Sequence, residues 1–345
     1  MRELSRRSLI AGLVVGGPAF AAGNHLLSAG KTPRSKRVAI IGGGPAGVAA
    51  ALALHQADTS ARLMLIERDP ATLNSISSAQ QRFQKPSVTG VFNKLKAAGI
   101  EIALDEIADI DWQRQNARGI SGRDFAFDDI VVAPGTTVQD EGIAGLDAIA
   151  RHRWPAAWGS PREAKRLTAQ LATMREGGHA VLRLPSGDVS HPAGLPHRAV
   201  EIAELLARKN PTSRLTVLDA THGTQAADAF ASAIAGTDLG QRVEWLGRET
   251  PVEVREVDAY AGRLETSYGA IQADVVNFIT AQEAGAIAQA AGLADHTGWC
   301  PCGDDMRSLI NPGAIVVGDA NRLAQRTVDG AVRSGVEATR TLLRA

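Results

Sequence analysis

The chain has 345 residues, more than one typical domain contains, so two or three domains are expected. Hydrophobic residues make up 44% of it and charged residues 21%, which fits an ordinary globular protein and excludes a disordered or fibrous one. Basic and acidic residues number 37 each, which argues against a nucleic-acid-binding protein, and two cysteines cannot form a disulfide framework.

The N-terminus has the features of an export signal. A twin arginine at 6–7 is followed by a modest apolar run at 9–22, and alanines at 19 and 21 offer a small-x-small cleavage site. This pattern predicts a bacterial twin-arginine signal peptide at 1–22, a linker at 23–36 and a periplasmic protein. The run is too short and too weakly apolar to predict a stable membrane span, and a basic tail is the alternative.

A strand, a tight turn and a helix are predicted at 38–54. The apolar run 38–41 ends in three glycines, and an alanine-rich run follows. Gly42 allows the sharp turn, Gly44 leaves room for a pyrophosphate, and Gly47 lets the helix pack close to the strand. The helix N-terminus offers free N–H groups and a positive dipole end to phosphates. The residues expected to bind a dinucleotide here are Gly42, Gly44, Pro45, Ala46 and Gly47.

A second apolar run, 63–66, ends in Glu67, twenty residues beyond Gly47. A carboxylate at that distance accepts hydrogen bonds from a ribose. Arg68, the next residue, is expected beside the same ligand. Because strand, GxGxxG turn, helix, strand and acid occur in order, the unit predicts dinucleotide binding rather than a structural turn.

The first half continues with short elements and then an apolar strand at 130–132. The earlier elements are a loop with a short helix at 71–88, a helix at 91–98 and strands at 100–103 and 107–110. The apolar strand ends in Ala133-Pro134-Gly135, where flavoproteins with two dinucleotide-binding domains usually have Ala-Thr-Gly.

The second half repeats the strand–helix–strand–acid plan without its glycines. The pattern predicts helices at 161–174 and 199–208, with strands at 180–185 and 215–219. The connecting loop, 186–194, has no GxGxxG, so no NAD(P)H is expected there. The remaining predictions are short antiparallel strands at 243–245, 252–254 and 263–268, a buried strand at 273–279, a strand at 315–320 and a last helix at 327–343.

These motifs together resemble the flavoproteins with two dinucleotide-binding domains. The segments 127–135, 155–158, 273–279, 291–293 and 298–301 more closely resemble the flavoprotein subunit of flavocytochrome c sulfide dehydrogenase. The resemblance implies FAD and an α/β fold of two interleaved Rossmann-like domains, each with three β/β/α layers. It implies a two-part FAD-binding domain at 37–153 and 273–345 around a second domain at 154–272. The FAD contacts that it adds are Ala133, Pro134, Gly135, Gly318, Asp319 and Gly330.

The chain departs from that family at its redox centre. The family has a redox cysteine pair beside the flavin, and one member lies in a Cys-Pro-Pro-Gly-Pro loop. His191 stands at that position here, and the family's second cysteine belongs to a further C-terminal domain. The family's Pro-Lys-Ser-Gly becomes 327–330, with Thr, Val, Asp and Gly. Thiol chemistry at the flavin, and the family's cytochrome contact, are therefore open questions.

Several side chains have more than one interpretation. His191 and His197 would pass protons at the flavin or lie in an exposed loop. Cys300 and Cys302 would form a strained redox pair, bind a metal with His296, or pack in the core.

Other candidates divide between flavin contact and structure. Asp319 would accept a hydrogen bond from the flavin ribityl chain or cap a helix, and Asp329 would cap the last helix or oppose its dipole near the flavin. Trp154 and Trp158 would line the flavin site or pack in the core.

The sequence thus predicts an exported FAD-dependent oxidoreductase. A small substrate, with sulfur compounds among the candidates, would reduce FAD, and the electrons would pass singly to a cytochrome c or a quinone. One alternative is a non-catalytic flavin-binding accessory protein that has lost its redox disulfide. An NAD(P)H-dependent reductase is disfavoured by the missing second glycine motif.

Overall fold

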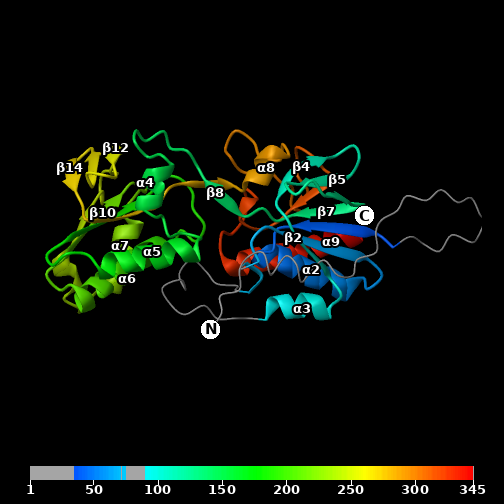
Figure 1. Cartoon of the computed structure of the whole chain (residues 1–345), viewed down its shortest axis with the longest axis horizontal. Coiled ribbons are helices and arrows are strands. Elements are labelled where there is room, and N and C mark those ends of the chain that lie inside the picture. The colour runs from blue at the N-terminus through cyan, green and yellow to red at the C-terminus, as the bar shows by residue number, and fades with distance from the viewer. Residues whose placement is uncertain (1–34, 71, 75–89, 345) are drawn as a thin grey trace, which may run out of the picture. The chain divides into compact units, whose positions relative to one another are not determined.

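A computed structural model describes residues 35–70, 72–74 and 90–344 (Figure 1). The predicted signal peptide, most of the linker and most of the 71–88 loop lie outside the described residues; of that loop only a 3-10 turn, η1 (Thr72–Asn74), is described. Among the described residues, no helix is both long and apolar enough to span a membrane.

The first sheet contains five parallel strands in the order β17-β7-β1-β2-β3. Its strands are β1 (Arg37–Ile41), β2 (Arg62–Glu67), β3 (Glu101–Leu104), β7 (Asp129–Val132) and β17 (Ala314–Val316). The central strand β1 is apolar throughout after its first residue, as expected of a parallel strand that is covered on both faces. Ile40 pairs with Leu65 on one side and with Val131 on the other, and all three are fully buried.

One face of this sheet is covered by helices and the other by a second, antiparallel sheet. The helices are α2 (Pro45–Ala57), α3 (Val91–Ala97) and α9 (Val328–Leu343) (Figure 1). The antiparallel sheet contains β4 (Ile107–Asp111), β5 (Asn116–Gly119) and β6 (Asp124–Ala126), and α8 (Ala286–Ala290) packs beside it. Side chains alternate along β1, so Ile40 packs under the helices and Ile41 packs under the antiparallel sheet. The predicted three layers are confirmed.

Helices α2 and α9 approach closely because the residues between them are small. A Cβ on Gly335 of α9 would lie 2.1 Å from the carbonyl oxygen of Ala46 and 3.0 Å from the backbone nitrogen of Ala50. Only glycine fits this position, so the helix that follows the first strand is packed directly against the last helix of the chain.

The second sheet repeats this architecture with four parallel strands in the order β11-β10-β9-β15. They are β9 (His179–Leu184), β10 (Arg214–Asp219), β11 (Val243–Leu246) and β15 (Val275–Phe278). The helices α5 (Pro161–Ala172), α6 (Gly194–Lys209) and α7 (Gln225–Ala233) pack on one face. The other face contacts α4 (Ala148–Arg153) and the antiparallel strands β12 (Val254–Asp258), β13 (Arg263–Thr266) and β14 (Gly269–Gln272).

One strand direction was predicted wrongly. The segment 243–245 was expected in an antiparallel pair, but β11 pairs parallel to β10, with Val217 opposite Trp245. Trp245 packs on Phe230 of α7 with ring centroids 5.0 Å apart, and its indole N–H donates to Asp219 at 2.9 Å. The strand therefore extends the second Rossmann-like sheet at its edge.

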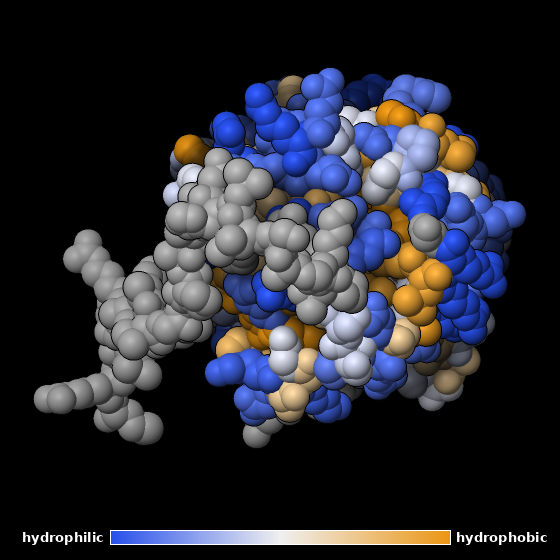
Figure 2. All heavy atoms as spheres, turned by 90° about the vertical axis from the view of Figure 1, so that its right-hand side faces the viewer, coloured by the Kyte–Doolittle hydropathy of each residue, from blue (hydrophilic) through white to orange (hydrophobic). Residues whose placement is uncertain are grey.

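Two short strands connect the halves. β8 (Thr136–Val138) follows β7 directly, and β16 (Gln282–Ala284) follows β15; the two pair antiparallel. The chain thus leaves the first sheet through β8 and returns through β16 to form β17 and α9, which confirms the interleaved fold. The exact domain limits stay predictions. On the face in Figure 2, hydrophilic residues cover most of the described surface, and hydrophobic residues form smaller groups.

Candidate functional site

The turn between β1 and α2 has the geometry of a phosphate cradle. Gly42 has φ +104°, and a Cβ there would lie 2.1 Å from the carbonyl oxygen of Ala133. A Cβ on Gly47 would lie 1.9 Å from the carbonyl oxygen of Gly42. A Cβ on Gly44, in contrast, would meet no described atom within 4 Å. Gly42 and Gly47 are therefore required by the protein itself, whereas the space at Gly44 is open to a ligand.

The N-terminus of α2 is prepared for an anion. Gly44 is its N-cap and provides no side-chain hydrogen bond, and Pro45 occupies the first turn. The N–H groups of Ala46 and Gly47 therefore have no side-chain cap at the positive end of the helix dipole. A pyrophosphate above Gly44 would fill this role.

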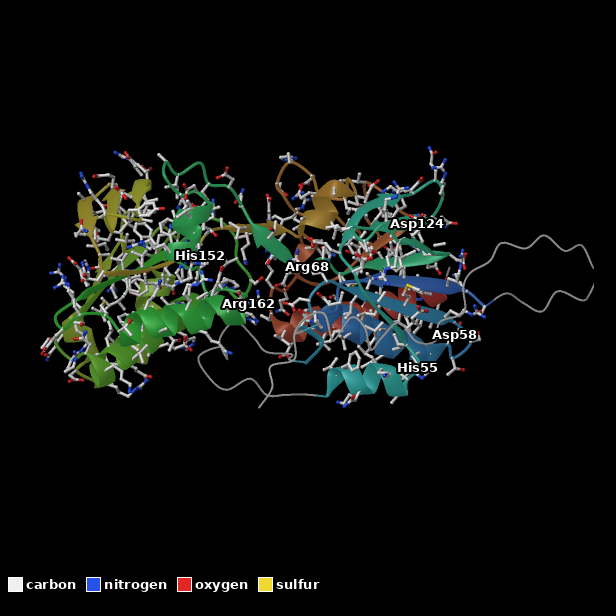
Figure 3. All side chains as sticks on the ribbon, in the orientation of Figure 1. His55, Asp58, Arg68, Asp124, His152 and Arg162 are labelled. Atoms are coloured by element: carbon white, nitrogen blue, oxygen red, sulfur yellow. The ribbon has the colours of Figure 1, made fainter. Side chains whose placement is uncertain are left out.

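The acid at the end of β2 lies under the glycine turn. Glu67 is 8% exposed, and its carboxylate accepts hydrogen bonds from the N–H groups of Gly43 at 2.5 Å and Asp69 at 2.8 Å. These contacts hold the carboxylate beside the cradle, where lone pairs remain for ribose hydroxyls. Arg68 is exposed and pairs with Glu106 at 3.1 Å; Figure 3 places it near the opposite end of β2 from Asp58.

Ala133, Pro134 and Gly135 close the end of β7. The N–H of Ala133 donates to the carbonyl of Ile41 at 2.7 Å, so this segment runs beside the turn of β1. Gly135 has φ +62°, and its carbonyl accepts from the N–H of Gly285 at 2.9 Å. The three predicted residues therefore lie at the same carboxyl edge of the sheet as the cradle, where open α/β sheets bind ligands.

Asp319 follows β17 at this edge, within a 3-10 turn, η4 (Gly318–Ala320). Gly318 has φ +75°, and a Cβ there would lie 3.0 Å from that of Ala46, which places the turn against the start of α2. Burial raises the pKa of the Asp319 carboxyl, while a hydrogen bond from Ser190 and the charges of His191 and Arg326 act in the opposite direction.

The start of α9 completes this edge. Thr327 is the N-cap, and its hydroxyl accepts from the N–H of Gly330 at 3.0 Å. A Cβ on Gly330 would lie 2.1 Å from the carbonyl oxygen of Gln325. Packing within the chain thus explains Gly330, and its predicted contact with FAD stays a prediction.

The loop that lacks the glycine motif brings His191 to the same place. The N–H of His191 donates to the carbonyl of Arg326 at 2.8 Å. Ser190 accepts at its carbonyl from the Trp158 indole at 2.7 Å, and its N–H donates to Gln282 at 2.7 Å. His191 has φ +54°, a left-handed conformation that costs a non-glycine residue about 1–3 kcal/mol. Such strain persists only where surrounding contacts determine it, as these do.

Trp158 and Trp154 have different environments. Trp158 is 5% exposed and holds the His191 loop through its indole hydrogen bond to Ser190. Trp154 is 4% exposed and stacks on Phe278 with ring centroids 6.2 Å apart. Trp154 belongs to a hydrophobic core, as its packing interpretation predicted.

The two cysteines lie in a hydrophobic core. Cys300 and Cys302 are buried and form no disulfide. Burial is the main cause that raises each thiol pKa to about 12, so thiolate is scarce at neutral pH. The described residues contain no cluster of three or more histidine, cysteine, aspartate or glutamate side chains placed for a metal.

Two residues of this region were not predicted from the sequence. Arg326 lies over the ring of Trp299, with the guanidinium carbon 3.8 Å from the ring centroid, and its terminal nitrogen Nη1 pairs with Asp188 at 3.3 Å. Ser190 hydrogen-bonds to Asp319. An isolated arginine and an isolated serine give no local signal, since only the fold brings them to Asp319.

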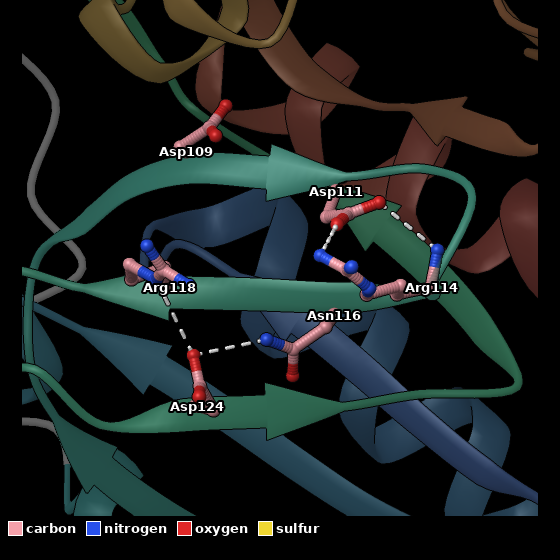
Figure 4. A pocket seen from close by; sticks show the side chains of 6 residues that line it. All are labelled: Asp109, Asp111, Arg114, Asn116, Arg118 and Asp124. Atoms are coloured by element: carbon pink, nitrogen blue, oxygen red, sulfur yellow. Dashed lines mark hydrogen bonds and ion pairs between the residues drawn. The ribbon is translucent and has the colours of Figure 1, made fainter.

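A polar pocket lies elsewhere, on the antiparallel sheet β4-β5-β6 (Figure 4). Asp111 pairs with Arg114 at 3.3 Å, and Asp124 pairs with Arg118 at 3.5 Å and accepts from Asn116 at 3.0 Å. Opposite charges pair across the surface of the pocket. The residues that line the pocket are far in sequence from the phosphate cradle. We interpret this pocket as a solvated face of the sheet with surface salt bridges.

Comparison with known proteins agrees with this geometry. The family model of the sulfide dehydrogenase (flavocytochrome c) flavoprotein chain, central region, matches residues 164–280. The pyridine nucleotide-disulphide oxidoreductase model matches residues 36–167. The chain resembles the flavoprotein chain of flavocytochrome c sulfide dehydrogenase. The two matches together include both parallel sheets except β17, so the chain resembles these flavin-dependent oxidoreductase families over both sheets.

Solved structures share the fold at low identity. The sulfide:quinone oxidoreductase from Aquifex aeolicus matches with a TM-score of 0.68 and 15% identity over 90% of this chain and 77% of that one. The NAD-dependent persulfide reductase from A. fulgidus matches with 0.66 and 18%, over 90% and 59%. Reduced Bacillus anthracis CoADR-RHD matches with 0.66 and 17%, over 89% and 57%. The chain therefore spans less than two thirds of the last two proteins.

The residues present fit FAD. Gly44 leaves open space at an uncapped helix N-terminus, Glu67 is held beside it, and Asp319 follows at the same edge. These three positions suit the pyrophosphate, the adenosine ribose and the ribityl chain respectively.

Proposed function

We propose that this chain is an exported flavin enzyme that oxidises a small donor, a reduced sulfur compound first among the candidates, and passes electrons to a cytochrome c or a quinone. The main support is the hydrogen bond between the N–H of His191 and the carbonyl of Arg326, which joins the loop of the second sheet to the predicted flavin edge. The match of residues 164–280 to the central region of a sulfide dehydrogenase supports the class of donor.

Bound FAD would accept two electrons from the donor and release them singly. The chain's own residues would position the cofactor and manage a proton. The cradle at Gly44 would bind the phosphates, and Asp319 would accept a hydrogen bond from a ribityl hydroxyl. His191 has the residue type for transferring a proton at neutral pH, and its loop is fixed by Trp158 and Gln282.

A second candidate is a flavin-binding accessory protein without turnover. Its support is that the two thiols of the chain, Cys300 and Cys302, are buried in a hydrophobic cluster, and that burial raises the pKa of each. Sulfide capture on a disulfide beside the flavin is not available to the described chain.

Anaerobic bleaching of the bound flavin separates the two candidates. Purified protein is mixed with sulfide, polysulfide, thiosulfate, sulfite and a set of amines, and the flavin absorbance is followed. Cytochrome c or a soluble quinone is then added, and reoxidation is timed. Bleaching by a sulfur donor and reoxidation by either acceptor would support the enzyme. Protein that keeps oxidised FAD with every donor would support the accessory role.

Export is a separate part of the proposal and rests on the twin arginine at 6–7. Changing Arg6 and Arg7 together to Lys should leave the precursor in the cytoplasm, because the twin-arginine pathway reads that pair. Cell fractionation and immunoblotting measure the distribution. A double variant that reaches the periplasm at the normal rate would disprove this route.

A further inference from the structure

Arg198, on helix α6, is a buried arginine whose side chain is only 1% exposed. Its Nε donates to Glu201 at 3.2 Å, its Nη1 to the side chain of Asn277 at 3.1 Å, and its Nη2 to the carbonyl of Ala157 at 3.2 Å. Its guanidinium carbon lies 5.2 Å from the ring centroid of Trp158. Burying a cation is costly unless its donors are paired, and these contacts fix the direction of the whole guanidinium.

The segment before Trp158 is held by the same network. The side-chain amide of Asn277 donates to the carbonyls of the two residues that precede Ala157, at 2.9 and 2.6 Å. The N–H of Ala157 donates to Glu163 at 3.0 Å, and Ala157 has φ +50°, a left-handed conformation that needs such support. Arg198 donates to the Ala157 carbonyl and also contacts the Trp158 ring, so it fixes the place from which the indole N–H donates.

The peptide group between Ser190 and His191 is held at both ends. Its carbonyl accepts from the Trp158 indole at 2.7 Å, and its N–H donates to the carbonyl of Arg326 at 2.8 Å. Both groups belong to one planar unit, so a rotation of that plane breaks both hydrogen bonds. Such a rotation by about 180° would bring φ of His191 from +54° to a negative value, which histidine favours. Relief of backbone strain therefore favours the rotated peptide, and the two hydrogen bonds oppose it.

We propose that Arg198 is a positioning residue for His191, because it holds Trp158 where the indole keeps the peptide before His191 in its strained orientation. The contact of His191 with the carbonyl of Arg326 then depends on Arg198 as well. The consequence for catalysis rests on the proposed function, in which His191 transfers a proton at the flavin. In this role Arg198 touches neither substrate nor cofactor.

The test measures hydrogen exchange at the amide of His191 by NMR, in purified protein with its bound FAD whose histidines alone carry the label. Trp158→Phe removes the indole N–H and keeps most of the ring, and Arg198→Met removes the charge and keeps most of the length. Trp112→Phe is the matched control, because the Trp112 indole donates in the same way to the carbonyl of Ala291, at 3.1 Å. The spectrum of His191→Gln identifies the signal.

The expected effect is local to the His191 loop. Trp158→Phe should speed exchange at His191 about tenfold relative to the other histidines, as the loss of one net hydrogen bond does. Arg198→Met should do the same and also lower the melting temperature, because Glu201 loses its partner. The double variant should exchange no faster than Trp158→Phe alone, since both changes act on one contact. Arg198→Lys should recover part of the protection, and Trp112→Phe should leave exchange at His191 unchanged.

Three results would overturn the proposal. Unchanged exchange at His191 in folded Trp158→Phe protein would show that the indole does not hold the peptide. Effects that multiply in the double variant would show that Arg198 does not act through Trp158. Faster exchange in Arg198→Met that is equal at every histidine would make Arg198 structural. A His191 ring signal that does not respond when dithionite reduces the bound flavin would count against the proposed function alone, because amide exchange is measured without turnover.

Discussion

Gly44→Val is expected to remove FAD binding without unfolding the protein. Gly44 has φ −70° and ψ −178°, an extended conformation that valine adopts readily, and a Cβ there meets no described atom within 4 Å. The valine side chain would instead occupy the space above the N-terminus of α2, where the pyrophosphate must approach.

The magnitude follows from the lost hydrogen bonds. Keeping the phosphates away from the N–H groups of Ala46 and Gly47 would remove about two charge-assisted hydrogen bonds, each worth about 1.5–3 kcal/mol. The sum of about 3–6 kcal/mol corresponds to a rise in Kd of about 10²–10⁴-fold. FAD content after purification and the Kd from flavin fluorescence on apoprotein measure it.

Two glycines serve as controls. Gly90 is the N-cap of α3, has φ −69°, and its Cβ would lie no closer than 3.8 Å to a neighbour, so Gly90→Val should leave FAD binding unchanged. Gly47→Val should instead fail to fold, because its Cβ would lie 1.9 Å from the Gly42 carbonyl oxygen. Folded Gly44→Val protein with normal FAD content and Kd would refute the assignment of this turn.

Three further predictions concern the second half and the core. NADH and NADPH should reduce the flavin slowly or not at all, because the loop 186–194 has no glycine cradle; rapid bleaching by either would disprove this. Replacing Cys300 and Cys302 by Ser should lower the free energy of unfolding by about 1–2 kcal/mol and leave the rate of flavin reduction unchanged, while His191→Ala should slow flavin reduction by about 10²-fold. If stopped-flow measurements show slow reduction in the cysteine variant and normal reduction in His191→Ala, the cysteines are the redox centre. Burial lowers the pKa of His179 below its unfolded value of 6.5, so the neutral side chain favours the folded state above that pH and this stability is lost as the pH falls. Urea titrations should show a loss of unfolding free energy between about pH 7 and about pH 5, and a smaller loss in His179→Gln. Equal losses in the two proteins would contradict this prediction.

The long elements of the fold are predictable because their signals are local. The apolar run at 38–41 followed by glycines predicts β1 and the start of α2, and 215–219 predicts β10 almost to the residue. Strands of three or four residues, such as β6 and β16, are too short to show a period. The direction of β11 depends on which strand it joins, and that partner is fixed by the helices between them rather than by its own sequence.

The candidate site divides in the same way. Gly42, Gly44 and Glu67 are recognisable because one strand–turn–helix–strand unit contains them all. The contact of His191 with Arg326 joins a loop of the second sheet to the segment between β17 and α9, so no local sequence pattern predicts it. The direct FAD contacts of the predicted residues stay predictions until a complex is measured.

The place of Gly335 against Ala46 has a consequence for biosynthesis. Helix α2, which begins at the phosphate cradle, packs against the last helix, α9, and β17 is the last strand to join the first sheet, beside β7. The strand β17 and the helix α9 leave the ribosome only after the whole second sheet has emerged. The second sheet can therefore fold first, while the first sheet still lacks its edge strand and one of its covering helices. Cofactor insertion would then be a late event of maturation, since the site for the flavin has no complete wall until the final residues of α9 have been made.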